Sequence, residues 1–312
     1  MNKNVLPNLF IPGAAKSGTS SLHELLNQHP DIYMSKIKEP HFFSWDDQFE
    51  KGLEYYSKLF EKGIESKYRG ESTTGYMIFP KVIDRIKKTL PEQPKFIFIL
   101  RNPIDRAYSH YWWLRGIGLE NRSFKEAFLT DMDKEPDPED KYSGNYKYYY
   151  QTGLYGKWLE RFYNNFNPEN IFVITTEQLK NNPLQTLNSC FKFLKLQTLE
   201  DIKIEKQNQT VILKEKDAKI YGKIAMYLRD RNRATPLRRI LRIILPDQVR
   251  GKVFKLLNKN LEEYKNKKII KNSYPSLSEE YRKFILNFYM EDFEKLKKLT
   301  QKDFKEWKDF YG

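Results

Sequence analysis

The chain has 312 residues, enough to bury a large core, and we predict a single α/β domain over residues 1–312. Its 55 lysines and arginines against 41 acidic residues give a formal net charge of +14, which favours anionic partners such as nucleotides, acidic glycans or nucleic acid. The single Cys190, expected in the core, excludes an internal disulfide framework, and no zinc-like spacing occurs, so we predict no metal site.

The N-terminal stretch carries no charged segment followed by an apolar run of the kind that targets a chain for export. No apolar stretch approaches the ~18 to 20 residues needed to cross a bilayer. These features predict a soluble, cytoplasmic protein.

Residues 9–26 predict a strand, a tight loop over residues 13–21 and a helix. The loop offers Lys16, hydroxyls and backbone N–H groups to a ligand over the helix N-terminus, where the macrodipole favours a phosphate or sulfate. Lys16 comes two residues before Gly18, whereas a Walker A loop places its lysine directly after the second glycine. The pattern therefore indicates an anion-binding loop of another kind, or a turn that only connects the strand to the helix.

Residues 36–43 follow a predicted short strand over 32–34. Proline restricts the residue before it to extended conformations, so Glu39 is expected on a strand or a loop. His41 and two aromatic residues beside Glu39 form a partly desolvated setting in which a carboxylate can act as a base. The alternative is that Glu39 is a surface residue and His41 a hydrogen-bonded helper.

The apolar run over residues 95–100 predicts a strand buried on both faces of a parallel sheet, and Pro103 suits the first turn of the next helix. Arg101 would lie at the carboxyl end of this strand, where open α/β sheets bind their ligands. Ser109 would lie about two turns along the helix, able to face the same ligand.

The remaining elements are predicted more coarsely. A strand running into a hydroxyl-rich loop is expected over 67–76, and a further buried strand over 171–174. The basic segment 229–242 predicts a helix packed on the domain, with a membrane-surface helix as the alternative. The C-terminal part, about 217–312, predicts amphipathic helices that pack back onto the domain.

Three of these segments together resemble the sulfotransferases that use 3′-phosphoadenosine 5′-phosphosulfate (PAPS). Residues 16–20 fit the 5′-phosphosulfate loop, residues 39–43 match the E-x-H-F-F motif of heparan-type glycan sulfotransferases, and Arg101 with Ser109 fits the 3′-phosphate site. Ser44 and Ser72 depart from that pattern, which often has an aspartate and a lysine there, so the acceptor stays open. The resemblance implies a three-layer α/β/α fold with a central parallel sheet, similar to P-loop nucleotide kinases, and a helical C-terminal tail.

The resemblance also implies roles for individual residues. Glu39 is the catalytic base, Lys16 meets charge on the bridging oxygen, and His41 orients Glu39 or the acceptor. The residues implied to bind PAPS, and its product 3′-phosphoadenosine 5′-phosphate (PAP), are Lys16, Ser17, Gly18, Thr19, Ser20, Arg101 and Ser109. Further candidates are Glu71 and Tyr76 on the acceptor side, and Lys206 and Lys214 in a basic loop over the nucleotide.

The implied reaction is sulfonate transfer to a hydroxyl, or less readily an amine, of a saccharide or small-molecule acceptor. A sulfonate in transfer carries less charge than a phosphoryl group, so a lysine and backbone amides suffice and no metal is required. Two alternatives remain: a kinase-like phosphotransferase with a degenerate loop, and a non-catalytic nucleic-acid-binding protein that uses the positive charge. The loop spacing argues against the first alternative, and the scattering of lysines among glutamates argues against the second.

Overall fold

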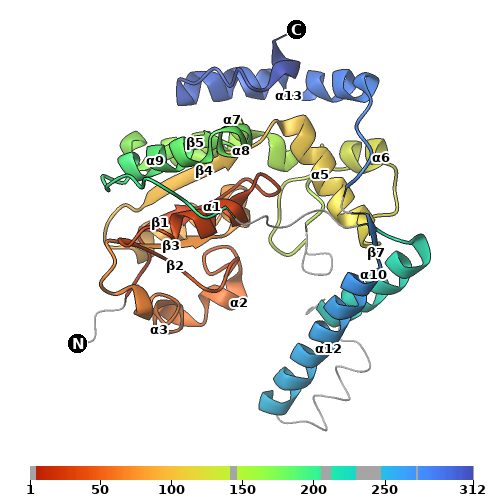
Figure 1. The fold of residues 1–312 in the computed structure, drawn as a ribbon, viewed down its shortest axis with the longest axis horizontal. Coiled ribbons are helices and arrows are strands. Elements are labelled where there is room, and N and C mark those ends of the chain that lie inside the picture. The colour runs from red at the N-terminus through yellow and green to blue at the C-terminus, as the bar shows by residue number, and fades with distance from the viewer. Residues whose placement is uncertain (1–4, 141–145, 205–211, 230–246, 272, 312) are drawn as a thin grey trace.

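A parallel five-stranded sheet forms the centre of the protein (Figure 1). The computed structural model describes residues 5–140, 146–204, 212–229, 247–271 and 273–311. The strands are β1 (Leu9–Ile11), β2 (Ile32–Met34), β3 (Tyr68–Ser72), β4 (Lys95–Leu100) and β5 (Ile171–Thr175), in the order β2-β3-β1-β4-β5. Every neighbouring pair is parallel, so all five carboxyl ends lie along one edge of the sheet.

The sheet buries both of its faces because successive side chains of a strand point to opposite sides. In β4, Phe96 and Phe98 enter one core, whereas Ile97 and Ile99 enter the other. The first core is covered by α4 (Val82–Thr89), α5 (Pro103–Gly116) and α7 (Tyr155–Tyr163), and the second by α1 (Thr19–Leu26), α8 (Thr176–Asn181) and α9 (Pro183–Phe193). This arrangement confirms the predicted three-layer fold.

Local sequence signals explain where two of these helices begin. The α5 helix has Pro103 in its first turn, and the side chain of Asn102 caps it by accepting a hydrogen bond from the Ile104 backbone N–H at 3.0 Å. Gly18 precedes α1 with a φ of 93°, a left-handed conformation that glycine adopts without strain. Cys190 on α9 is fully buried, as predicted, and burial raises the pKa of its thiol to about 12.

Shorter elements complete the layers between the strands. They are α2 (Asp46–Phe49), α3 (Gly52–Ser57), α6 (Phe124–Leu129) and the 3₁₀ turns η1 (Glu61–Gly63), η2 (Thr74–Met77), η3 (Gln151–Gly153), η4 (Pro168–Asn170) and η5 (Lys308–Phe310). Helix α2 follows the segment with Glu39 and η2 follows β3, so these two elements border the carboxyl edge of the sheet.

The C-terminal part is helical, as predicted, and divides into two regions. Helices α10 (Glu215–Arg229) and α12 (Asp247–Lys267) pack on each other and project as an arm (Figure 1), with the antiparallel strands β6 (Ile212–Leu213) and β7 (Ile269–Lys271) at its base. Helix α13 (Glu279–Thr300) lies along α7, where the Asp292 carboxylate accepts hydrogen bonds from the backbone N–H groups of Gly156 and Lys157. The β6–β7 pair was not predicted.

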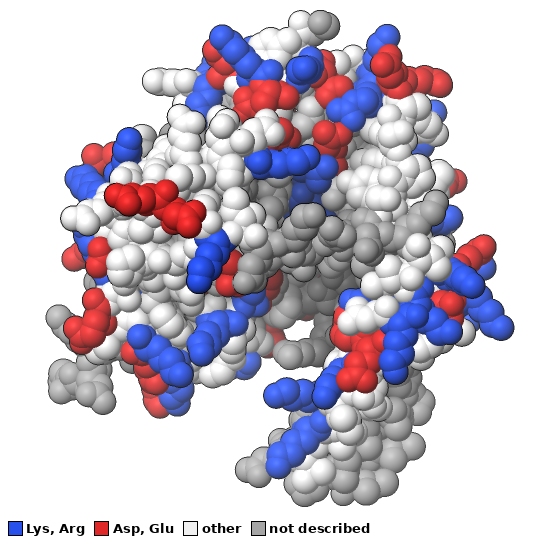
Figure 2. Space-filling view, in the orientation of Figure 1, with Lys and Arg blue, Asp and Glu red and all other residues white. Residues whose placement is uncertain are grey.

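Charge is distributed rather than gathered on the face that Figure 2 shows, where basic side chains are interspersed with acidic ones over the body. Most of the predicted helix over 229–242, and Lys206, fall outside the described residues. Along the described ranges, no helix is both long and apolar enough to cross a membrane. The cytoplasmic location stays a prediction.

Candidate functional site

The loop between β1 and α1 is held against β4 at the carboxyl edge of the sheet. The Ala14 N–H donates to the Ile99 carbonyl at 2.8 Å, and the Ile99 N–H donates to the Gly13 carbonyl at 3.0 Å. The N-cap residue of α1 is Gly18, and among the described residues no side-chain hydrogen bond caps this N-terminus. Its first N–H groups are therefore available to an anion. Ser17, by contrast, is fully buried.

Lys16 and Arg101 meet at this edge although 85 positions separate them in the chain. The Arg101 guanidinium donates to the Lys16 carbonyl at 3.5 Å. The Lys16 ammonium lies 4.6 Å from the centre of the Trp113 ring on α5. Ser109 precedes Trp113 by one turn, so both lie on the α5 face that meets the loop. The structure thus brings the two predicted anion-binding segments together.

The charged form of Lys16 is disfavoured in the free protein, and a bound anion would stabilise it. Burial is the main cause that lowers its pKa from 10.5 to about 8, and the positive charges of Arg101 and Lys38 add to it. An anion beside the ammonium favours its charged form. The site therefore combines a helix N-terminus with three cations and accommodates negative charge.

Glu39 lies in a loop beside the end of β3, one of the two predicted settings, but its φ of 54° is left-handed and not the extended conformation expected before a proline. Its carboxylate is oriented by Thr74. The Thr74 N–H donates to Glu39 Oε2 at 2.9 Å and its hydroxyl to Oε1 at 3.1 Å, while His41 Nε2 lies 3.6 Å from Oε2. Burial raises the pKa of Glu39, against the opposing effects of Lys38 and Thr74. The side chain is still 32% exposed, so an acceptor can reach this base.

Backbone strain coincides with the three predicted catalytic residues. Lys16, Glu39 and His41 have φ values of 69°, 54° and 55°, and they are three of the six non-glycine residues with positive φ in the described part of the chain. Side chains favour this region poorly, and a folded protein retains such residues where the surrounding structure enforces them, which is frequent at functional sites.

Lys38 is a site residue that the sequence reasoning missed. Its ammonium donates to the Ser20 hydroxyl at 2.7 Å and lies 3.9 Å from Glu39 Oε1, so it links the first loop to the candidate base. Burial lowers its pKa, and the nearby Glu39 opposes that effect. Lys36 and Lys38 are both lysines in a polar stretch, and no spacing in the sequence singled out the second.

Glu71 and Tyr76 lie beneath the site and do not line its surface, which corrects their expected place on an acceptor-facing wall. Both are almost completely buried, and burial raises the pKa of Glu71 to about 7. The Tyr76 hydroxyl donates to Glu71 Oε1 at 2.8 Å and accepts from the Phe43 N–H at 3.1 Å, while Tyr56 and Thr73 also donate to Glu71. This cluster holds the loop that carries Glu39 and His41.

The two serines that depart from the family pattern are turned toward histidines. The Ser44 hydroxyl lies 2.9 Å from His41 Nδ1. The Ser72 hydroxyl lies 2.7 Å from Nδ1 of His23, whose other ring nitrogen donates to the Ser35 carbonyl at 3.1 Å. Neither serine supplies a charge to the site, and Lys38 is the cation whose charge acts on Glu39.

Aromatic residues cover the His41 side of the site. The His41 ring stacks on Trp45, with ring centres 3.8 Å apart. Trp45 Nε1 donates to the Tyr146 hydroxyl, which donates in turn to the Pro138 carbonyl, both at 2.8 Å. The acidic loop over 133–140 is thereby tied to the candidate base. Lys214 is exposed next to β6, and no contact joins it to this site within the described ranges.

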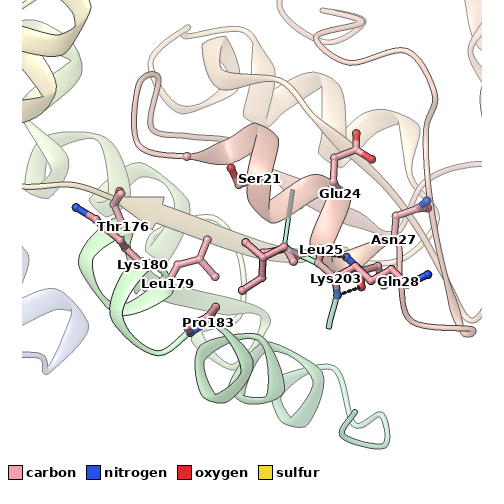
Figure 3. A pocket seen from close by; sticks show the side chains of 12 residues that line it. Ser21, Glu24, Leu25, Asn27, Gln28, Thr176, Leu179, Lys180, Pro183 and Lys203 are labelled. Carbon is pink, nitrogen blue, oxygen red and sulfur yellow. Dashed lines mark hydrogen bonds between the residues drawn. The ribbon is translucent and has the colours of Figure 1, made fainter. Parts of the chain in front are cut away.

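A pocket of about 510 Å³ opens beside the first loop, between α1 and the α8–α9 segment (Figure 3). Its wall includes Gly18 and Ser21 on one side, Thr176 and Leu179 on the other, and Lys203 near its far end. The Thr176 hydroxyl bonds the carbonyls of Ser17 at 2.6 Å and Leu100 at 3.0 Å, so the wall is continuous with the loop. The volume is typical of a small-molecule site.

Among the described residues, no group of three or more histidine, cysteine, aspartate and glutamate side chains is arranged to hold a metal ion. The arrangement instead offers cations and N–H groups for an anionic ligand and one oriented carboxylate for proton transfer.

Comparison with known proteins gives a consistent picture. The family model described as "Sulfotransferase domain" matches residues 6–227. Heparan sulfate glucosamine 3-O-sulfotransferase 5 of Homo sapiens is 32% identical over 192 residues, 61% of this chain and 54% of that protein. Heparan sulfate glucosamine 3-O-sulfotransferase 3A1 of Mus musculus is 31% identical over 206 residues, 66% of this chain and 50% of that protein. The matched region thus spans about half the length of these relatives.

Among solved structures, a sulfotransferase from Alicyclobacillus acidocaldarius aligns with a TM-score of 0.65 at 24% identity, covering 97% of this chain and 98% of that one. At this level of identity the likeness concerns the fold. It extends over the C-terminal part, which lies beyond the matched family region.

Proposed function

Because this chain belongs to the sulfotransferase domain family, we propose that it is an enzyme that transfers a sulfonate group from PAPS to an acceptor hydroxyl and releases PAP. One observation carries the proposal: Lys16 and Arg101, predicted to bind opposite ends of the same nucleotide, lie side by side at one edge of the sheet. A nucleic-acid-binding protein gives no reason for an oriented carboxylate at this edge, and a kinase-like phosphotransferase gives none for a loop whose lysine precedes Gly18.

The donor would occupy the site in a single orientation. The 5′-phosphosulfate lies over the α1 N-terminus, contacted by Lys16 and by the N–H groups of Gly18 and Thr19, with Ser17 and Ser20 completing the loop. Arg101 and Ser109 hold the 3′-phosphate, for which a guanidinium gives a two-point grip. The adenine base fits the pocket beside Gly18 and Thr176, because that pocket begins where the loop ends.

The chemistry follows from the positions of two charged groups. Glu39 takes the proton of the acceptor hydroxyl while the hydroxyl oxygen forms its bond to sulfur. The bond between sulfur and the bridging oxygen breaks at the same time, and the electron pair stays on the 5′-phosphate of PAP. Lys16 stabilises the negative charge that grows on that oxygen. Lys38, between Ser20 and Glu39, stabilises the sulfonate oxygens during the transfer.

His41 acts in this scheme by positioning the base. Its Nε2 lies 3.6 Å from Glu39, while Ser44 and the Trp45 ring fix the imidazole from two other sides. A saccharide acceptor is favoured, because the similar enzymes named above act on heparan sulfate glucosamine and because two partly exposed aromatic residues, Trp45 and Tyr146, lie beside the candidate base. A small-molecule hydroxyl or an amine is a second possibility for the acceptor. The cytoplasmic location is part of this proposal and rests on the sequence alone.

The proposal is tested with donor labelled on its sulfonate and a panel of saccharide, phenol and amine acceptors. Wild-type protein should transfer label without added ATP. Glu39→Gln should lower kcat by roughly 10²- to 10⁴-fold, the usual contribution of a general base, while PAP binding changes by less than about twofold. Glu54→Gln, an exposed carboxylate on α3, is the matched control and should have wild-type activity.

Two results would contradict the proposal. Equal label transfer by wild type and Glu39→Gln would exclude Glu39 as the base. Transfer of the γ-phosphate from ATP in the presence of Mg²⁺, without detectable PAP binding, would instead establish the kinase-like alternative.

A further inference from the structure

The C-terminal segment contacts the turn that carries Arg101, although it lies beyond the matched family region. Helix α13 runs past α5 (Figure 1). Its Arg282 contacts Asp105 in the first turn of α5. Three residues, Arg282, Trp307 and Asp309, form what we call the C-terminal brace. The brace has no role in the function proposed above.

The brace fixes Asn102, the residue directly after Arg101. Asn102 Nδ2 donates to Asp309 Oδ2 at 2.7 Å, while its Oδ1 caps α5. The Asn102 N–H donates to Glu177 Oε1 at 3.2 Å, and Trp307 Nε1 donates to the other oxygen of that carboxylate at 3.0 Å. The backbone and side chain of Asn102 are thus both tied, directly or through Glu177, to the C-terminal segment.

A further contact on this turn comes from the body of the protein. The Arg101 carbonyl accepts a hydrogen bond from the Tyr155 hydroxyl at 2.8 Å. The peptide between Arg101 and Asn102 is therefore held from both ends, which restricts the directions available to the Arg101 side chain. A guanidinium that must meet a phosphate in one geometry gains affinity from such preorganisation.

Arg282 also pairs with two carboxylates beside the turn. Its Nε donates to Asp309 Oδ1 at 2.7 Å, and its NH1 group lies 2.6 Å from Asp105 Oδ1 on the first turn of α5. Without Arg282, these two carboxylates would present uncompensated negative charge beside the position of the 3′-phosphate. Asp105 precedes Ser109 by one turn of α5, and negative charge close to a bound anion weakens its binding.

We propose that the C-terminal brace sets the preference of this protein for nucleotides that carry a 3′-phosphate. Its residues are positioning residues: they orient Arg101 through Asn102, and Arg282 neutralises Asp105 and Asp309. The inference rests on the proposed function, because it takes Arg101 as the group that holds the 3′-phosphate. It adds a part of the chain that lies beyond the matched family region to the determinants of donor choice.

The test compares the affinities for PAP and for adenosine 5′-phosphate, which differ by the 3′-phosphate. Arg282→Gln should weaken PAP binding by about tenfold, a loss of about 1.4 kcal/mol, and change adenosine 5′-phosphate binding by less than about twofold. Arg282→Lys keeps the charge and should recover part of the preference. The matched control is Lys295→Gln, which removes another ion pair of α13, the one to Glu160 on α7, and should leave the ratio of the two affinities unchanged.

The possible outcomes distinguish a failure of the brace proposal from a failure of the proposed function on which it rests. Equal affinity of the wild-type protein for both nucleotides would overturn the 3′-phosphate site and the brace together. A wild-type preference for PAP that Arg282→Gln retains would overturn the brace alone. A parallel loss of both affinities with a lower Tm would show that Arg282 only stabilises the fold, which also overturns the brace.

Discussion

Raising the pH above 8 is expected to weaken PAP binding through Lys16. In the free protein, burial and the charges of Arg101 and Lys38 lower the pKa of Lys16 to about 8. In the complex, the 5′-phosphate beside the ammonium favours the charged form, so the pKa rises again. Above pH 8 the free protein has lost a proton that the complex retains, and binding must take that proton up. Affinity is therefore constant below this pH and falls above it.

The size of the effect follows from the two pKa values. If the bound anion restores the usual value of 10.5, the pKa of Lys16 rises on binding by 10.5 − 8, about 2.5 units. The dissociation constant then increases by up to tenfold per pH unit and is about 30-fold higher near pH 9.5 than near pH 7. If the bound anion raises the pKa of Lys16 by less, the dissociation constant increases by a smaller factor, but it still increases with pH.

Calorimetric titration of PAP between about pH 7 and 10, in two buffers of different ionisation enthalpy, measures both the affinity and the proton uptake. Lys16→Arg keeps a permanent charge and should bind PAP with little pH dependence in this range. Lys38→Met serves as the second comparison, because the pKa of Lys38 is lowered too. A flat dissociation constant up to pH 9.5, or the same pH dependence in Lys16→Arg, would refute the reasoning.

Three further substitutions test the site and its support. Lys38→Met removes the ammonium between Ser20 and Glu39. It should lower the single-turnover rate of transfer by roughly 10- to 100-fold and leave PAP affinity nearly unchanged, and an unaltered rate would exclude Lys38 from stabilising the sulfonate. Tyr76→Phe removes the hydroxyl that joins Glu71 to the Phe43 N–H. Urea unfolding should show that the free energy of unfolding falls by about 1–3 kcal/mol, and a value within about 0.5 kcal/mol of wild type would contradict a stabilising role of this buried network. Gly222→Ala places a Cβ 2.4 Å from the Gly118 carbonyl oxygen, where α10 meets the end of α5. This variant should lower the free energy of unfolding by about 1–3 kcal/mol, whereas Lys223→Ala, at an exposed position, should not. Equal thermal unfolding of the two variants would show that the backbone moves apart there without loss of stability.

The Ser44 and Ser72 departures bear on the acceptor more than on the donor. Both hydroxyls are used within the protein, by His41 and His23, and both side chains are almost completely buried. The donor half of the site, from Lys16 to Arg101, does not involve them.

Local sequence was sufficient for the elements that carry the donor site. An apolar run, Gly18 and Pro103 mark where strands end and helices begin, because each acts on its own backbone or on neighbours within a few residues. The alternation of β4 side chains between two cores follows from the strand period in the same way. These signals also excluded a helix at Glu39 and placed Arg101 at a carboxyl edge, but the φ of 54° at Glu39 was not predicted, because it is imposed by contacts with the rest of the site.

Contacts between distant residues were decided by the tertiary structure alone. Asp309 bonds Asn102 across 207 positions, and Trp307 reaches Glu177 across 130, with no pattern in either segment that identifies the other. Lys38 became a site residue only because α1 and the Glu39 loop meet, and Glu71 became a support only because Tyr56, Thr73 and Tyr76 enclose it. The sequence by itself therefore determined the local units and their chemistry, while the packing of those units determined which side chains share a site.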